Sequence, residues 1–149
     1  MKTKLAVLCS ANVCRSPVIE AILQKKIKEA GLKDIEVTSM GAAPECGTMY
    51  RDPVMVRLAM NYGYTIEGMN RYMTSEDLKD TDLILVMTMQ HKIQVQNKLH
   101  TTVGDASVSL MNIVSALTNR WMTLRIVRRR SMKRPSSIWK KAAVSLLKS

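Results

Sequence analysis

A cysteine and an arginine, Cys9 and Arg15, stand six positions apart near the start of the chain. The apolar run at residues 5–8 predicts a buried strand before them, and Ser16-Pro17 predicts an N-cap with proline in the first helical turn after them. A loop between strand and helix can turn its N–H groups inward as an anion-binding nest, to which the helix dipole adds positive potential. Arginine binds phosphate oxygens bidentately, and a thiolate is a nucleophile. The spacing therefore predicts phosphoryl transfer to the sulfur of Cys9.

The wider stretch at residues 9–17 resembles the signature of the low-molecular-weight protein tyrosine phosphatases. In that family a cysteine, five residues, an arginine and Ser-Pro follow the first strand. One residue departs from the pattern, since Ala11 stands where glycine is common. Weaker similarity continues at residues 38–41 and 82–87, the latter followed by His91, so it covers roughly residues 3–114. The positions that match the signature are Cys9, Asn12, Cys14, Arg15, Ser16 and Pro17.

The resemblance implies a role for each residue of this loop. Cys9 would attack phosphorus and form a phosphocysteine, while Arg15 and the loop amides would bind the phosphate and its transition-state charge. Asn12 would hold the loop in shape, and Ser16 would donate a hydrogen bond to the Cys9 thiolate. The resemblance implies no cofactor. The loop residues expected around the phosphate are Ser10, Ala11, Asn12, Val13, Cys14 and Ser16.

The other cysteines and the two histidines have simpler interpretations. Cys14 either caps Cys9 as a reversible disulfide under oxidation or packs as an ordinary side chain, and the sequence leaves both open. Related enzymes with this loop reduce arsenate, but they need further cysteines, and the remaining Cys46 is predicted to be an ordinary loop thiol. His91 and His100 have no partners at metal-ligand spacing, so we expect no metal site.

A general acid is missing from the sequence. Hydrolysis of phosphotyrosine needs a group that protonates the leaving phenolate, and the family uses an Asp followed by Pro close to the C-terminus. The only Asp-Pro here is Asp52-Pro53, which lies too early and is explained as a helix start. Asp105 is the last acidic residue, and no proline follows it. We therefore predict that this chain contains no general acid and that its turnover is impaired.

Charge divides the chain into two parts. The net charge is +11, yet residues 1–105 contain 13 of the 23 Lys and Arg together with all 12 Asp and Glu. Residues 106–149 contain the other 10 basic residues and no acid. We predict a phosphatase-like domain over residues 1–114 and a basic, atypical tail over residues 115–149. We do not expect nucleic acid as a partner of the domain, although use of the tail's charge on nucleic acid or an anionic membrane stays open.

The codons of the tail suggest how it arose. Trp and Met each have a single codon, so reading Trp121-Met122-Thr123 one nucleotide earlier gives two adjacent aspartates. Leu124 then permits a proline, and the alternative frame encodes Asp-Asp-Pro, the acid motif of the family. We hypothesise that the tail is a frameshifted copy of a phosphatase C-terminus, with the slip near residues 114–118.

The rest of the chain alternates between strand and helix patterns. Further strands are predicted at residues 35–39, 83–87 and 108–110, and helices at residues 16–30, 52–60, 74–80 and 89–99. This alternation predicts an α/β fold in which a central four-stranded parallel sheet has helices on both faces, as a three-layer sandwich. The phosphate loop would follow the first strand, in a chain whose 149 residues suffice for a core.

The resemblance implies a phosphotyrosine phosphatase that acts on phosphoproteins or small aryl phosphates. Inorganic phosphate and other oxyanions would inhibit it. Three cysteines exclude a disulfide scaffold and indicate a reducing compartment, expected to be the cytoplasm, and no apolar run approaches the ~20 residues of a membrane span. Two other functions stay open, namely a module that binds phosphate or phosphoproteins without turnover, and an enzyme similar to arsenate reductases.

Overall fold

The computed structural model describes residues 2–43 and 49–100, together with two short strands at residues 104–106 and 125–128. The strands are β1 (Thr3–Cys9), β2 (Ile35–Gly41), β3 (Leu83–Val86), β4 (Gly104–Ala106) and β5 (Arg125–Arg128). The helices are α1 (Arg15–Glu29), α2 (Pro53–Asn61), α3 (Ser75–Lys79) and α4 (Met89–Leu99).

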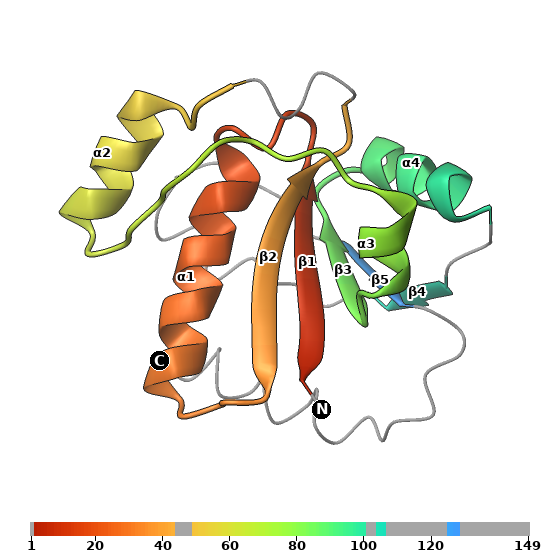
Figure 1. Cartoon of the computed structure of the whole chain (residues 1–149), viewed down its shortest axis with the longest axis horizontal. Coiled ribbons are helices and arrows are strands. Elements are labelled where there is room, and N and C mark those ends of the chain that lie inside the picture. Colours follow the sequence, from red (N-terminus) through yellow and green to blue (C-terminus); the bar gives the residue numbers. More distant parts are fainter. Residues whose placement is uncertain (1, 44–48, 101–103, 107–124, 129–149) are drawn as a thin grey trace.

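The strands form one sheet in the order β2-β1-β3-β5-β4 (Figure 1). β1 runs parallel to both of its neighbours, so that Leu5 lies opposite Val37 of β2 and Leu83 of β3. β5 runs antiparallel to β3, and β4 runs antiparallel to β5. Because β1, β2 and β3 are parallel, their carboxyl ends meet at one edge of the sheet, and the loop that follows Cys9 begins there.

The α/β class is confirmed, whereas the expected four-stranded parallel sheet is not. The described sheet has three parallel strands, and its two further strands are antiparallel. An apolar run shows that a strand is buried, but its direction depends on the path by which the chain returns to the sheet. The strand expected at residues 108–110 lies outside the described residues, and β5 comes from the segment expected to be a tail.

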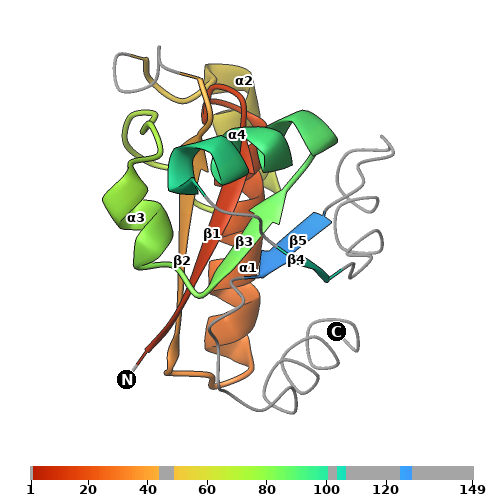
Figure 2. The same ribbon diagram turned by 90° about the vertical axis from the view of Figure 1, so that its right-hand side faces the viewer.

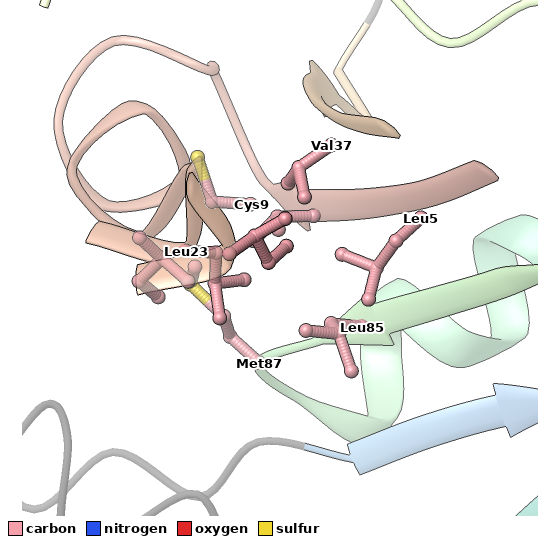
Figure 3. Close-up of a cluster of buried hydrophobic side chains, with 9 residues drawn as sticks. Leu5, Cys9, Leu23, Val37, Leu85 and Met87 are labelled. Carbon is pink, nitrogen blue, oxygen red and sulfur yellow. The ribbon is translucent and has the colours of Figure 1, made fainter. Parts of the chain in front are cut away.

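Helices cover both faces of the sheet, as expected for three layers. On one face, Ile19 and Leu23 of α1 pack against a cluster that includes Leu5 and Leu85 (Figure 3). On the other face, α3 and α4 contribute side chains to a second cluster around Leu8. Figure 2 shows α4 in front of the strands and α1 behind them. α2 lies outside α1 and packs against it through a third cluster.

Local signals set the start of α2, as predicted, and the end of α1. The Asp52 side chain accepts hydrogen bonds from the N–H groups of Val54 and Met55, both at 2.9 Å, and Pro53 follows it as the first residue of α2. Gly31 comes directly after the C-cap of α1 with a φ of 68°, a left-handed conformation that glycine adopts at little cost. Among the described helices, none combines the length and apolar composition needed to cross a bilayer.

Candidate active site

Cys9 is the last residue of β1, and its side chain is only 2% exposed. Figure 3 shows it at one end of the cluster beneath α1. Its Sγ lies 3.0 Å from Ser16 Oγ and accepts a hydrogen bond of 3.2 Å from the backbone N–H of Asn12. Donors on a sulfur stabilise its thiolate form, so the surroundings of Cys9 suit a nucleophile.

Asn12 forms the centre of a buried hydrogen-bond network. Its amide nitrogen donates to Ser16 Oγ at 2.8 Å and to Ser39 Oγ at 2.9 Å. Its side-chain oxygen accepts from the backbone N–H of Arg71 at 2.9 Å and from the Arg51 guanidinium at 2.7 Å. A carboxamide has two N–H groups and two acceptor sites, so all four are used here. The network ties the loop to β2 and to the segments around residues 51 and 71.

Asn12 also adopts a backbone conformation that few residues tolerate. Its φ is 55°, in the left-handed region, and its side chain is fully buried. Asparagine reaches this region more readily than most non-glycine residues because its short side chain can hydrogen-bond locally. The resemblance implied that Asn12 keeps the loop in shape, and its contacts provide a physical basis for that role.

Backbone carbonyls of the loop are bound by the segments that surround it. The carbonyls of Cys9 and Ser10 accept from the N–H groups of residues 42 and 43, both at 2.9 Å. The carbonyl of Ala11 accepts from the Asn70 side chain at 3.0 Å, and that of Val13 accepts from the Asp52 N–H at 3.2 Å. The Asn12 carbonyl accepts from Arg51. With these carbonyls bonded outward, the loop has the polarity that an anion-binding nest requires.

Arg15 opens α1 with an exposed side chain, and the helix begins two residues earlier than predicted. The prediction that Ser16 is the N-cap is wrong, because Cys14 holds that position and no side chain caps the helix. Ser16 is fully buried, and its hydroxyl contacts Cys9 and Asn12 instead. The Arg15 guanidinium makes one long contact within the loop, of 3.5 Å from Nη2 to Ser10 Oγ. It is thus placed beside an uncapped helix N-terminus, where anions bind.

His91 reaches the same loop from the first turn of α4. Its side chain is 3% exposed, and Nε2 lies 3.0 Å from Ser10 Oγ. Burial, and then the positive charge of Arg15, lower the pKa of His91 below its ordinary value, so the imidazole is neutral near pH 7. Across the part of the chain that the structure describes, no group of three or more His, Cys, Asp or Glu could hold a metal ion.

Cys14 has a partly buried free thiol. Burial raises its pKa most, followed by the charge of Asp52 and that of Cys9. It therefore stays protonated near neutral pH, and a disulfide with Cys9 remains a prediction. Cys46 and the segment Trp121-Met122-Thr123 lie outside the described residues.

Three residues of the network had no role in the sequence interpretation, namely Ser39, Arg51 and Arg71. Ser39 lies near the carboxyl end of β2, and carboxyl ends of adjacent parallel strands meet at one edge of the sheet. Its position in β2 could therefore have indicated that it lies close to the loop after β1. Arg51 and Arg71 belong to segments with no motif of their own. Only the fold shows that they contact the loop.

The chain is similar in sequence to one protein family. The sequence model of the family described as low molecular weight phosphotyrosine protein phosphatase matches residues 4–118. The low molecular weight protein-tyrosine-phosphatase Etp of Escherichia coli K12 is 33% identical over 92 residues, which are 61% of this chain and 58% of the relative. A phosphatase of Streptomyces coelicolor with the same general name is 25% identical over 108 residues, covering 72% and 65% of the two chains. The chain thus spans a little over half the length of the Escherichia coli relative.

Solved structures show the same fold. Vibrio vulnificus Wzb in complex with benzylphosphonate matches with a TM-score of 0.57 and 28% identity, over 66% of each chain. A protein tyrosine phosphatase from Entamoeba histolytica matches with a TM-score of 0.62 and 26% identity, over 65% of this chain and 63% of the other. The fold of this chain therefore has counterparts in experimental structures of phosphatases.

Proposed function

The chain belongs to the low molecular weight phosphotyrosine protein phosphatase family, and we propose that it hydrolyses aryl phosphate monoesters, phosphotyrosine in proteins among them. Cys9 is the nucleophile, and its sulfur attacks phosphorus while the bond to the aryl oxygen breaks and its electron pair leaves with that oxygen. Water then attacks the phosphocysteine, the sulfur–phosphorus bond breaks, and inorganic phosphate and the thiolate are released. No metal or cofactor takes part in either step.

One observation carries this proposal, namely the position of the Cys9 sulfur. It lies between the Ser16 hydroxyl and the Asn12 N–H, in a loop whose carbonyls are bonded outward and which leads into the start of α1. A hydrogen-bonded sulfur and the N-terminus of a helix thus lie at one place, which supports the proposal. The Arg15 guanidinium supplies a bidentate donor to phosphate oxygens, and its charge opposes the negative charge of the transition state.

The decisive experiment follows a phosphoryl group on Cys9. 4-Nitrophenyl phosphate is mixed with the full chain, the reaction is quenched in acid, and the peptide that contains Cys9 is examined by mass spectrometry for one phosphoryl group. We expect Cys9→Ser to abolish release of nitrophenol while retaining binding of inorganic phosphate. Arg15→Lys lowers kcat/KM by about 10²-fold or more, because an ammonium cannot replace the bidentate fork. A Cys9→Ser protein that still turns over would contradict the assignment.

The general acid is the weak part of the proposed reaction. General acid catalysis contributes about 10²–10⁴-fold, and most when the leaving group is basic. Nitrophenol leaves readily without a proton and the phenol of tyrosine does not, so we expect slow cleavage of nitrophenyl phosphate and far slower cleavage of phosphotyrosine. Restoring the alternative frame at Trp121-Met122-Thr123 to give Asp-Asp-Pro should rescue phosphotyrosine hydrolysis more than nitrophenyl phosphate hydrolysis. Equal rescue, or none, would show that the missing acid does not limit the chain.

The missing acid also supports a second function, the binding of phosphoproteins without steady turnover. A burst of nitrophenol equal in amount to the enzyme, followed by no steady release, would distinguish binding from catalysis.

We keep the domain boundary near residue 114 as part of the proposal, because the family similarity ends at residue 118 and every residue after 105 that carries charge is basic. Turnover requires a reduced thiol at Cys9, so we propose that the protein works in the cytoplasm or another reducing compartment.

A further inference from the structure

His91 combines two features that a packing residue does not need. Its imidazole is buried, and Nδ1 has no hydrogen-bond partner among the described residues. Its Nε2, by contrast, makes a contact of 3.0 Å with the hydroxyl of Ser10, which directly follows the nucleophile. An apolar side chain could fill this space without burying an unpaired nitrogen. Val95, one turn further along α4, is such a side chain and is fully buried. The histidine therefore points to a role in its contact with Ser10.

The contact continues from Ser10 to the phosphate-binding arginine. Ser10 Oγ is 3.0 Å from His91 Nε2 and 3.5 Å from Arg15 Nη2. The guanidinium cannot accept a hydrogen bond, so the Ser10 oxygen is the acceptor of the Arg15 contact. α4 covers the face of the sheet opposite to α1, which Arg15 opens. Ser10 thus links two helices on opposite faces at the edge where the nucleophile lies.

The proton on the imidazole has one favourable position. The neutral ring carries a single N–H, and if this were on Nδ1 a buried donor would lack a partner among the described residues. Buried donors without partners are rarer in proteins than buried acceptors without partners. With the proton on Nε2, the ring donates to Ser10 Oγ, which then accepts from both His91 and Arg15.

We propose that His91 is a positioning residue that holds Ser10 Oγ as a fixed acceptor for Arg15 and so orients the guanidinium towards the bound phosphate. This inference rests on the proposed function of the loop. It assigns His91 no contact with substrate, and it predicts that His91 affects the binding of every oxyanion at the loop. Because the guanidinium binds phosphate in both the ground state and the transition state, the oxyanion dissociation constant and kcat/KM both change.

The test compares variants of the full chain. His91→Leu removes the contact, His91→Gln retains an N–H that can reach Ser10, and Ser10→Ala removes the shared oxygen. The double variant of His91→Leu with Ser10→Ala completes a cycle. The control is His100→Asn, because His100 is exposed at the other end of α4 with a φ of 50°, which asparagine tolerates. The readouts are protection of Cys9 from iodoacetate by inorganic phosphate and kcat/KM for 4-nitrophenyl phosphate.

We expect His91→Leu to weaken phosphate protection and lower kcat/KM, each by about tenfold, the effect of losing one hydrogen bond. His91→Gln should recover most of this loss, and the double variant should be no worse than Ser10→Ala alone, because both substitutions break one contact. These effects should appear far below the melting temperature of each variant, where a change in stability alone has no influence.

The inference is overturned if inorganic phosphate protects Cys9 from iodoacetate equally well in the wild type and in His91→Leu. It is also overturned if the losses in kcat/KM caused by His91→Leu and Ser10→Ala multiply in the double variant, since the two residues would then act separately. If phosphate does not protect Cys9 in the wild type and nitrophenyl phosphate is not cleaved, the proposed function itself fails and the inference with it. The two failures are therefore distinguishable.

Discussion

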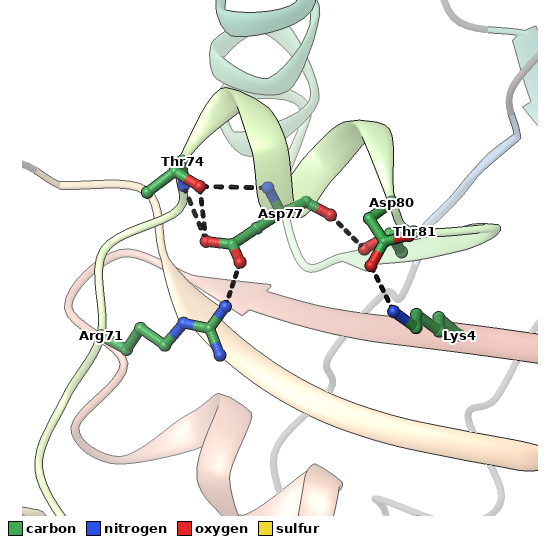
Figure 4. Close-up of polar contacts among 6 residues, drawn as sticks. All are labelled: Lys4, Arg71, Thr74, Asp77, Asp80 and Thr81. Carbon is green, nitrogen blue, oxygen red and sulfur yellow. Dashed lines mark hydrogen bonds and ion pairs between the residues drawn. The ribbon is translucent and has the colours of Figure 1, made fainter.

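Two polar networks in this protein look alike in chemistry and differ in burial. One surrounds Asn12 in the loop that follows β1, where Asn12 and Ser16 are fully buried. The other lies at the start of α3, where Thr74 and Asp77 form a capping box and Arg71 pairs with Asp77 (Figure 4). The side chains of Arg71 and Asp77 there are 49% and 25% exposed. Water can replace partners in the second network but not in the first.

The second network shows what a partly exposed carboxylate contributes. Burial alone would raise the pKa of Asp77, but hydrogen bonds from Thr74 and the charge of Arg71 outweigh it and the pKa is lowered. The ionised form is thus favoured in the folded state, yet an exposed ion pair stabilises little. In the loop, a lost partner leaves a buried donor or acceptor unsatisfied, which costs more than the bond itself contributed. We therefore expect substitutions in the loop to have the larger effects.

The largest effect is expected for Asn12→Ala. It removes the donor to the Ser16 and Ser39 hydroxyls and the acceptor of two N–H groups, all in a buried site, and it leaves a side chain without a polar group at a φ of 55°. We expect the free energy of unfolding to fall by about 3 kcal/mol or more. Urea unfolding at equilibrium measures this change.

The variant Asn12→Gly separates backbone strain from lost hydrogen bonds. Glycine tolerates the same φ, so it should be more stable than Asn12→Ala by about 1 kcal/mol while remaining well below the wild type. If glycine restored wild-type stability, the hydrogen bonds would contribute nothing and the contrast between the two networks would disappear.

The next effect is a pH dependence caused by His91. Its pKa is lowered in the folded state, mainly by burial, so the folded protein binds fewer protons than the unfolded chain below the ordinary value of about 6.5. This contribution to stability is complete above that pH and is lost as the pH falls towards the folded pKa, by at most about 1.4 kcal/mol per pH unit. Urea unfolding between pH 7 and pH 5 should show the loss in wild type and His100→Asn, and a smaller one in His91→Gln. If the free energy of unfolding changed equally with pH in all three proteins, His91 would not be the cause of the pH dependence.

A smaller effect is expected for Thr74→Ala at the start of α3. The Asp77 N–H donates to Thr74 Oγ1 at 3.0 Å, and this cap is exposed. Removal of this cap should lower the free energy of unfolding by about 1 kcal/mol, whereas Thr74→Ser should retain most of the stabilisation. A loss as large as that of Asn12→Ala would mean that exposure does not distinguish the two networks.

The smallest effect belongs to the ion pair between Lys4 and Asp80, whose side chains are 42% and 70% exposed (Figure 4). The hydrogen bond and charge of Asp80 raise the pKa of Lys4, but water and salt compete with this contact. We expect Asp80→Asn to leave the melting temperature unchanged within experimental error at physiological salt. A clear decrease would show that the pair acts through more than its exposed charges.

The sequence alone determined the elements that local interactions control. Apolar runs located β1, β2 and β3, and the Asp52-Pro53 pair located the start of α2, because these signals act between residues close in the chain. The spacing of Cys9 and Arg15 also located the loop, since a strand, a nest and a helix start are contiguous in sequence.

Only the tertiary structure decided how the loop is held and how the sheet is completed. Ser16 was expected both to cap α1 and to contact Cys9, and its buried hydroxyl contacts Cys9 and Asn12 but does not cap the helix. The antiparallel direction of β5 and the contacts that Arg51 and His91 make with the loop follow from packing between distant segments. His91 and Ser10 are 81 positions apart, and no local pattern encodes such a contact.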